Sequence, residues 1–197
     1  MPVEIVCIVE GHGECESVPI LIRRIAERFD PGLRVQVPHP IRVTKSRLLK
    51  QAELERAVGF AAVRAASGAG ILVLLDADDD CPAELGPSLL ARVQAARIDR
   101  PSAVVLANKE FESWFLAAAE SLRGHKGLPA DLERPENPEA VRGAKEWLNQ
   151  RIRSGAYSPT VDQPSFSARF DLEAAKRAPS FEKCYREVIR LLTALRG

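Results

Sequence analysis

The sequence predicts an α/β protein with a mostly parallel sheet, flanked by helices and followed by a helical C-terminal extension. Nearly continuous apolar runs alternate with segments of helical periodicity through residues 1–122, and no such run occurs in residues 123–197. Apolar runs of this kind are typical of parallel strands, which helices bury on both faces. We therefore expect an α/β core at residues 1–122, with residues 123–197 packed on it as a helical extension.

Three apolar runs have the composition of buried strands. Val3–Val9 is rich in β-branched residues, and Gly70–Leu75 (GILVLL) is the strongest strand signal in the chain. Ala103–Ala107 is a shorter run of the same kind. Between the first two, Arg34–Val43 is expected to be extended, although two prolines interrupt it.

Helices are expected between and after these strands. In Ser17–Phe29 the apolar residues recur at helical spacing, and Pro19 suits the first turn of a helix. The other segments predicted to be helical are Ala52–Ala66, Leu89–Ile98, Glu110–Leu122, Pro138–Arg151, Leu172–Arg177 and Phe181–Leu195. Arg123–Pro138 is rich in proline and charge, and we expect an exposed connection there.

Composition argues against several classes of protein. The chain of 197 residues has 28 basic and 27 acidic side chains, so its net charge of +1 gives no global signature of nucleic-acid binding. The four cysteines form no CxxC pair, which argues against a zinc site. No apolar run approaches the ~20 residues that cross a bilayer, and we see no signal peptide. We therefore expect a cytoplasmic protein with no membrane partner.

Acidic residues follow each of the three apolar runs. They are Glu10 and Glu14 after the first, Asp76, Asp78, Asp79 and Asp80 after the second, and Glu110 and Glu112 after the third. Ligands of open parallel sheets bind beyond the carboxyl ends of the strands. Carboxylates crowded at that edge repel each other, and burial raises the energetic cost of keeping them charged. A divalent cation would remove this repulsion, and oxygen-only ligands suit Mg²⁺ or Mn²⁺ better than zinc.

Two of these features also have simpler explanations, which the sequence leaves open. An acidic residue in the first turn of a helix, such as Glu14, is favoured by the helix dipole alone. The run Asp76–Asp80 (DADDD) could be a solvated turn, because aspartate favours turns. In an extended segment, however, Asp76, Asp78 and Asp80 would point the same way, which favours a shared ligand.

The order of these motifs resembles that of a known module. A strand that ends in Glu10-Gly11-His12-Gly13-Glu14 and a later strand that ends in Asp76-Ala77-Asp78 resemble the Toprim domain, the metal-binding module of topoisomerases, primases and OLD-family nucleases. More narrowly, Lys109–Leu116 (KEFESWFL), Tyr157–Pro164 (YSPTVDQP) and Ser180–Cys184 (SFEKC) resemble the DUF4276 family, a bacterial group in the Toprim-like clan. The resemblance implies a Toprim-like sheet in residues 1–122.

The resemblance also implies roles for the acidic residues. Glu10 would act as a general acid/base or a metal ligand, and Asp76 and Asp78 would hold Mg²⁺. Glu14 and Glu112 would complete the coordination shell. This sequence departs from the pattern in having a third alternating aspartate, which leaves the number of metal ions open. The metal ligands expected from the alternation and the resemblance together are Glu10, Glu14, Asp76, Asp78, Asp80 and Glu112.

Basic residues are needed as well, because phosphoryl transfer usually requires a cationic side chain directed at the phosphate. Lys45 and Lys109 are the first candidates for this catalytic role, and Lys145 is a more distant one. Arg42, Lys45, Arg47 and Lys50 form a basic stretch that would follow a nucleic-acid backbone or simply face solvent. The sequence does not decide between these two roles.

Two functions from different classes remain. The first is a Mg²⁺- or Mn²⁺-dependent nuclease, or related phosphotransferase, that acts on DNA or RNA in a bacterial defence or repair system. Toprim nucleases commonly act beside an ATPase, and this chain has no Walker motif, so that ATPase would be a separate protein. The second is a non-catalytic interaction or regulatory module that keeps the metal site.

Tyr157 and the pair Asp162-Gln163 lie in the polar segment YSPTVDQP. This segment either folds back over the acidic edge or forms a plain connecting loop with a packed tyrosine. We expect the loop.

Overall fold

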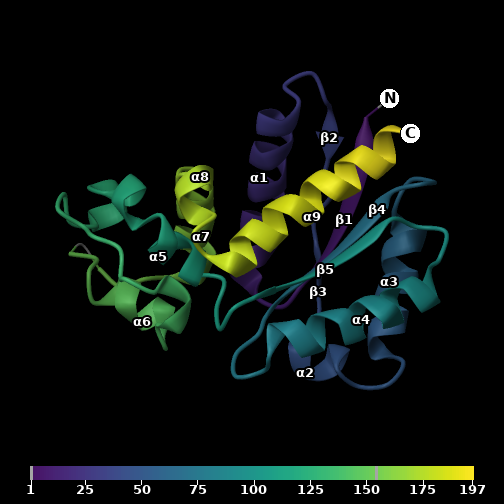
Figure 1. Ribbon diagram of the computed structural model, residues 1–197, viewed down its shortest axis with the longest axis horizontal. Helices are drawn as coiled ribbons and strands as arrows, with labels where there is room; N and C mark the ends of the chain where they lie inside the picture. The colour runs from purple at the N-terminus through teal and green to yellow at the C-terminus, as the bar shows by residue number, and fades with distance from the viewer. Residues whose placement is uncertain (1, 154) are drawn as a thin grey trace.

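The computed structural model describes residues 2–153 and 155–197 and has an α/β architecture (Figure 1). Its strands are β1 (Val3–Val9), β2 (Val35–Gln36), β3 (Ile41–Arg42), β4 (Gly70–Asp76) and β5 (Ser102–Ala107). They form a sheet in the order β2-β1-β4-β5, in which β3 also pairs with β1. Every pairing is parallel, as the apolar runs predict.

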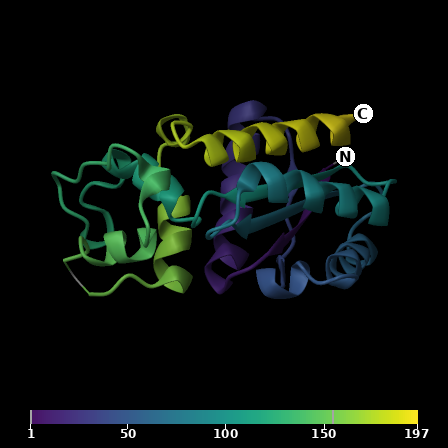
Figure 2. The ribbon, with the colours of Figure 1, turned by 60° about the horizontal axis from the view of Figure 1, so that its bottom comes forward.

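Helices cover both faces of the sheet and extend beyond one end. The α-helices are α1 (His12–Phe29), α2 (Lys45–Leu48), α3 (Glu53–Arg64), α4 (Pro82–Ala96), α5 (Ser113–Ala117), α6 (Ala144–Asn149), α7 (Pro159–Ser167), α8 (Leu172–Ala175) and α9 (Pro179–Arg196). Short 3-10 turns are η1 (Ala119–Leu122), η2 (His125–Gly127) and η3 (Pro138–Ala140). Figure 2 shows α9 lying along the sheet, with the segment that carries α5 to α8 gathered beyond one end of it.

The sheet separates two hydrophobic clusters, because successive side chains of a strand point to opposite faces. On one face, Cys7 of β1 belongs to a cluster with Val18 of α1 and Val188 of α9. On the other face, Ile8 belongs to a cluster with Val58 of α3, and α4 also contributes. The last helix of the chain is therefore part of the layer that covers the sheet. Whether residues 1–122 form a separable core stays a prediction.

The predicted strands are confirmed, but several helices have other bounds. Helix α1 begins at His12 rather than Ser17, because the Glu14 side chain accepts a hydrogen bond from the Gly11 backbone and completes the first turn. The helix predicted at Leu89 begins at Pro82, a residue that suits a first turn.

Two other predicted helices are divided in the structure. The helix expected at Glu110–Leu122 is two short elements, α5 and η1. The one expected at Pro138–Arg151 is η3 and α6, separated by Gly143, whose φ of 72° is the left-handed conformation.

Among residues 2–153 and 155–197, none of the helices has both the length and the apolar composition that spanning a membrane requires.

Candidate metal centre at the carboxyl edge of the sheet

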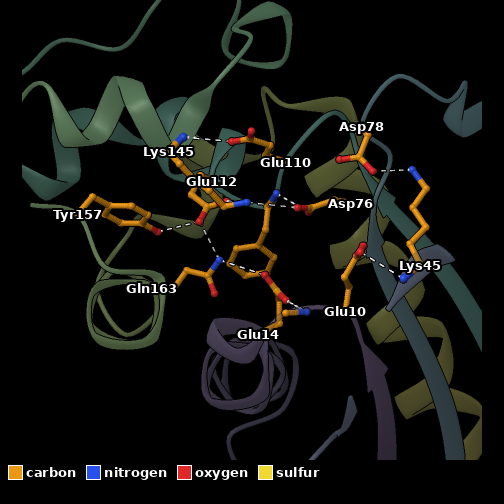
Figure 3. Close-up of polar contacts among 12 residues, drawn as sticks. Glu10, Glu14, Lys45, Asp76, Asp78, Glu110, Glu112, Lys145, Tyr157 and Gln163 are labelled. Atoms are coloured by element: carbon orange, nitrogen blue, oxygen red, sulfur yellow. Dashed lines mark hydrogen bonds and ion pairs between the residues drawn. The ribbon is translucent and has the colours of Figure 1, made fainter. Parts of the chain in front are cut away.

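Three neighbouring parallel strands bring acidic side chains to one edge. Glu10 directly follows β1, and Asp76 is the last residue of β4. Val9 pairs with Leu74, so the two strands end almost level. Glu112 follows β5 after a short turn and immediately precedes α5. The sheet edge predicted from the sequence therefore gathers one carboxylate from each strand (Figure 3).

Glu10 and Asp76 are each held by one backbone amide. The amide of Lys45 donates to Glu10 Oε1 at 3.2 Å, and the amide of Phe111 donates to Asp76 Oδ1 at 2.7 Å. The second oxygen of Glu10, Oε2, is buried and receives no hydrogen bond from the residues that the structure describes. Each carboxylate is thus oriented through one oxygen.

Glu112 is held in the same manner, but by side chains. The Tyr157 hydroxyl and the Gln163 amide both donate to Glu112 Oε1, each at 2.9 Å. Glu112 is fully buried, and its Oε2 has no hydrogen-bond partner among residues 2–153 and 155–197. Burial and the nearby Glu112 charge raise the pKa of Tyr157 above its ordinary value, so the hydroxyl keeps the proton that it donates.

The three carboxyl groups of Glu10, Asp76 and Glu112 all have raised pKa values. Burial raises the pKa of Glu10, Asp76 and Glu112 above their ordinary values. For Asp76, the neighbouring charge of Glu112 raises the pKa further. Removing water from these groups disfavours their charged forms, so a cation at this edge would be bound strongly.

Lys145 of α6 supplies one such cation from within the chain. Its Nζ lies 3.7 Å from Asp76 Oδ2 and 3.6 Å from Glu112 Oε2, between the two carboxylates (Figure 3). Both distances exceed those of ordinary hydrogen bonds. Burial opposes the charge on Lys145, but Glu112 and Asp76 outweigh it and raise the pKa of the ammonium group. The Lys145 backbone is fixed separately, because its amide donates to Glu110 Oε2 at 3.1 Å.

Lys45 supplies a second internal cation, and it is held much more closely. Its Nζ lies 2.9 Å from Asp78 Oδ2 and 2.8 Å from Asp80 Oδ2, and it also donates to the Ala77 carbonyl. The lysine side chain is 8% exposed, whereas those of Asp78 and Asp80 are 62% and 50% exposed. Asp78 and Asp80 therefore face solvent and Lys45. The backbone of Asp78 has a φ of 53°, so the chain turns there and does not continue as an extended segment.

Glu14 belongs to the edge, but both of its oxygens are already used. Oε2 accepts from the Gly11 amide, and Oε1 accepts from the Gln163 side chain at 3.1 Å. The two glycines of this turn leave room for these contacts. A Cβ at Gly11 would collide with the Glu14 carboxylate, and a Cβ at Gly13 would collide with Gln163 and lie 2.8 Å from the Pro159 carbonyl. The close approach of α7 to α1 therefore requires glycine at position 13.

Among the residues that the structure describes, the remaining basic candidates form no ion pair with Glu10, Asp76 or Glu112. Within the described part of the chain, the Lys109 side chain makes no hydrogen bond or ion pair, and its catalytic role stays a prediction. In the basic stretch, Lys45 is buried and Arg47 is paired with Glu53 at 2.7 Å. This stretch therefore offers fewer free cations to a nucleic-acid backbone than its sequence indicates.

The expectation of a plain loop at YSPTVDQP is wrong. Residues Pro159–Ser167 form α7, which packs against α1 and brings Tyr157 and Gln163 to the acidic edge. Proline in the first turn starts the helix, but two prolines and an uneven apolar pattern concealed it in the sequence. Asp162 stabilises the start of α7, because its Oδ2 accepts a hydrogen bond from the Ser158 amide at 2.8 Å.

The donor set fits a hard divalent cation. Glu10, Asp76 and Glu112 each have one oxygen held by an N–H or O–H donor and a second that receives no hydrogen bond from the described residues. Oxygen-only sets of this kind suit Mg²⁺ and Mn²⁺. In the described residues, no three His, Cys, Asp or Glu side chains already stand in ligating geometry. A bound ion would have to draw the carboxylates together and move the Lys145 ammonium aside.

Comparisons with known proteins give one match. The model of a protein family described as "Domain of unknown function (DUF4276)" matches residues 9–188. No curated protein and no solved structure matched the chain. The match spans the strand ends, α6 and α7, so every residue of the acidic edge lies within it.

Proposed function

The chain belongs to the DUF4276 family, and we propose that it is a Mg²⁺- or Mn²⁺-dependent nuclease, or a related phosphotransferase, that acts on nucleic acid. The observation that supports this proposal is the pattern of oxygens at the sheet edge. Two buried carboxylate oxygens, Glu10 Oε2 and Glu112 Oε2, receive no hydrogen bond from the described residues. Buried polar atoms are rarely left without a partner, so these two favour an ion as their ligand.

The ligands of this ion would be Glu10, Asp76 and Glu112, each through its open oxygen. A divalent cation in such a site neutralises phosphate charge and lowers the pKa of a bound water. Glu14, with both oxygens engaged, would stabilise the edge without binding the ion directly. Asp78 and Asp80 would keep their pairing with Lys45 and fix the loop after β4.

Lys145 would have two positions in this scheme. Without the ion, its ammonium group balances the charge of Asp76 and Glu112. With the ion bound, the ammonium group would be displaced toward solvent, which its side chain already reaches, being 36% exposed. There it would be free to contact a phosphate of the substrate. This assigns to Lys145 the role that the sequence suggested first for Lys45 and Lys109.

A relationship to Toprim domains is part of the proposal. The order of these acidic residues supports it: Glu10 directly follows β1, Glu14 lies in the first turn of α1, and Asp76 ends β4. The pairing of Asp78 with Lys45 is a departure, because the Toprim pattern uses that second aspartate for the metal. Toprim nucleases commonly act beside an ATPase in bacterial defence or repair systems. Because this chain has no Walker motif, such an ATPase would be a separate protein.

A non-catalytic metal-binding module is the alternative, and one observation favours it. Lys45 and Lys145 each already lie beside two carboxylates, so part of the negative charge of the edge is compensated by the chain itself, without a bound ion. In this case the ion would bind and change stability or partner binding, but no phosphodiester bond would be cleaved.

Cleavage assays on single- and double-stranded DNA and RNA, with Mg²⁺, Mn²⁺ or a chelator, separate these functions. We expect metal-dependent cleavage by the wild type and none above background by Glu10→Gln, Asp76→Asn and Glu112→Gln. Glu16→Gln is the matched control, because Glu16 is a solvent-facing residue of α1 with a side chain that is 65% exposed. Metal binding without cleavage of any substrate would favour the non-catalytic module, and absence of both would overturn the proposal.

A further inference from the structure

We propose that Tyr157 and Gln163 are positioning residues that select the divalent cation, because they restrict Glu112 to a single ligating oxygen. This inference rests on the proposed metal site and adds to it a preference for a small octahedral ion over Ca²⁺. The two residues belong to the YSPTVDQP segment, whose role the metal ligands alone do not explain.

Both donors bind the same oxygen. The Tyr157 hydroxyl and the Gln163 amide each lie 2.9 Å from Glu112 Oε1, and the described residues give Oε2 no hydrogen bond. Glu112 is fully buried, so water does not replace either donor. The carboxylate is therefore fixed with one oxygen engaged and the other directed to the edge (Figure 3).

The position of Gln163 is fixed from several sides. Its Nε2 also donates to Glu14 Oε1 at 3.1 Å, and its Oε1 accepts from the Ser17 hydroxyl at 3.4 Å. The side chain is fully buried, and Gly13 leaves the space that it occupies. Gln163 thus links the carboxylate after β5 to the one at the start of α1 and excludes Glu14 as a free ligand.

The coordination chemistry of the two ions explains the selectivity. Mg²⁺ requires six oxygens in near-ideal octahedral geometry at ~2.0–2.1 Å and retains several waters, so it takes carboxylates through one oxygen. Ca²⁺ accepts about 6–8 oxygens at ~2.3–2.6 Å and readily uses both oxygens of a carboxylate. A glutamate whose Oε1 already accepts two hydrogen bonds has only Oε2 free for a metal, which suits Mg²⁺ and disfavours Ca²⁺.

Glu112 is the carboxylate at which side chains decide this preference. Glu10 Oε1 and Asp76 Oδ1 are held by backbone amides, which substitutions of the donor residue do not remove. The donors to Glu112 belong to side chains, so substitutions at Tyr157 and Gln163 can weaken the hold on its Oε1 one donor at a time and release it when combined. The other contacts of Tyr157 do not depend on the hydroxyl, because its ring stacks on Phe166 with centroids 6.1 Å apart.

Calorimetric titration with Mn²⁺ and with Ca²⁺ tests the proposal on the full chain. In Tyr157→Phe, Gln163→Met and the double variant, we expect the ratio of the Ca²⁺ to the Mn²⁺ dissociation constant to fall. Substitutions around metal ligands typically change affinity about 10–100-fold, so we expect about 10-fold in the double variant. Tyr185→Phe, in the other tyrosine of the chain, should leave the ratio unchanged. Thermal unfolding of each variant verifies that the fold is retained.

The outcomes separate this inference from the proposed function. An equal loss of affinity for both ions, with an unchanged ratio, would mean that the two residues only support the fold, and would overturn the inference. A wild type that binds Mn²⁺ without discriminating against Ca²⁺ would overturn it as well, while leaving the metal site in place. A wild type that binds neither ion would overturn both proposals.

Discussion

The Lys145 ammonium group lies 3.6 Å from Glu112 Oε2, a buried oxygen to which no described residue donates a hydrogen bond. The lysine is close enough to balance the charge of Glu112 but too far to hydrogen-bond to it. Lys45, by contrast, is within 3 Å of both of its aspartates, at 2.9 and 2.8 Å. Of the two internal cations, Lys145 is therefore the one that a metal ion would displace more easily.

Replacing Lys145 with methionine should raise the affinity for Mn²⁺ severalfold, because it removes the cation that competes for Asp76 and Glu112. Titration of the chelator-treated protein with Mn²⁺ measures this change, and Lys183→Met on α9 is the control. If cleavage is also measured, its rate should fall in Lys145→Met, since the phosphate loses a cationic partner. Lower Mn²⁺ affinity in this variant would mean that Lys145 supports the ligands and does not compete with the metal.

Lys45→Met should lower the free energy of unfolding by about 1–2 kcal/mol, because the Ala77 carbonyl and the two aspartates lose a hydrogen-bond donor. The exposure of both aspartates limits the effect, since water can replace the lysine around them. Urea unfolding measures the change, with exposed Lys50→Met as a control expected within about 0.5 kcal/mol of wild type. An equal response of both variants would contradict the structural role of Lys45.

Gly13→Ala should lower the free energy of unfolding by about 1–3 kcal/mol, because the added methyl group collides with Gln163 and the Pro159 carbonyl. Gly59→Ala should change the free energy of unfolding in the opposite direction. Gly59 lies inside α3 and a Cβ added there would have no atom within 4 Å, so the alanine should stabilise the fold by about 0.5–1 kcal/mol. Equilibrium unfolding of the two variants tests this reversal, and a neutral Gly13→Ala would mean that α7 packs less closely on α1.

The free energy of unfolding of Asp76→Asn, compared with that of the wild type as a function of pH, should reveal how much charging Asp76 destabilises the fold. The pKa of Asp76 is raised by burial and by Glu112, so the aspartate binds its proton more tightly in the folded than in the unfolded state. Its stabilising contribution is therefore complete below the pKa of the unfolded chain and is lost as pH rises through the folded pKa. In chelator, the stability of Asp76→Asn relative to wild type should increase over that range and then level off. A relative stability that decreases with pH would require a lowered pKa.

The main layers of the fold are predictable because the strands are locally encoded. Val3–Val9 and Gly70–Leu75 are continuous apolar runs, and the residues that follow them reach the same edge in any parallel sheet. Glu10 and Asp76 could therefore be assigned to one site. Glu112 followed from the same reasoning, although the turn before it depends on Lys109, whose φ is 62°.

Other parts of the site depend on contacts that the local sequence does not encode. The alternation of Asp76, Asp78 and Asp80 predicts a shared direction, but the positive φ of Asp78 breaks the extended geometry on which that prediction depends. Gln163 lies 149 residues from Glu14 in the chain, and its contact exists only because α7 packs on α1. Periodicity reports on the local face of a helix, so it does not identify such a distant partner.

Crystals grown in chelator and soaked in Mn²⁺ give the most direct test of the central claim, because the anomalous signal of manganese locates the ion without a substrate. The account predicts a peak ~2.1 Å from one oxygen each of Glu10, Asp76 and Glu112, with the Lys145 ammonium moved away from the carboxylates. Absence of manganese from this edge, or a peak bound only by Asp78 and Asp80 with Lys45 displaced, would contradict it.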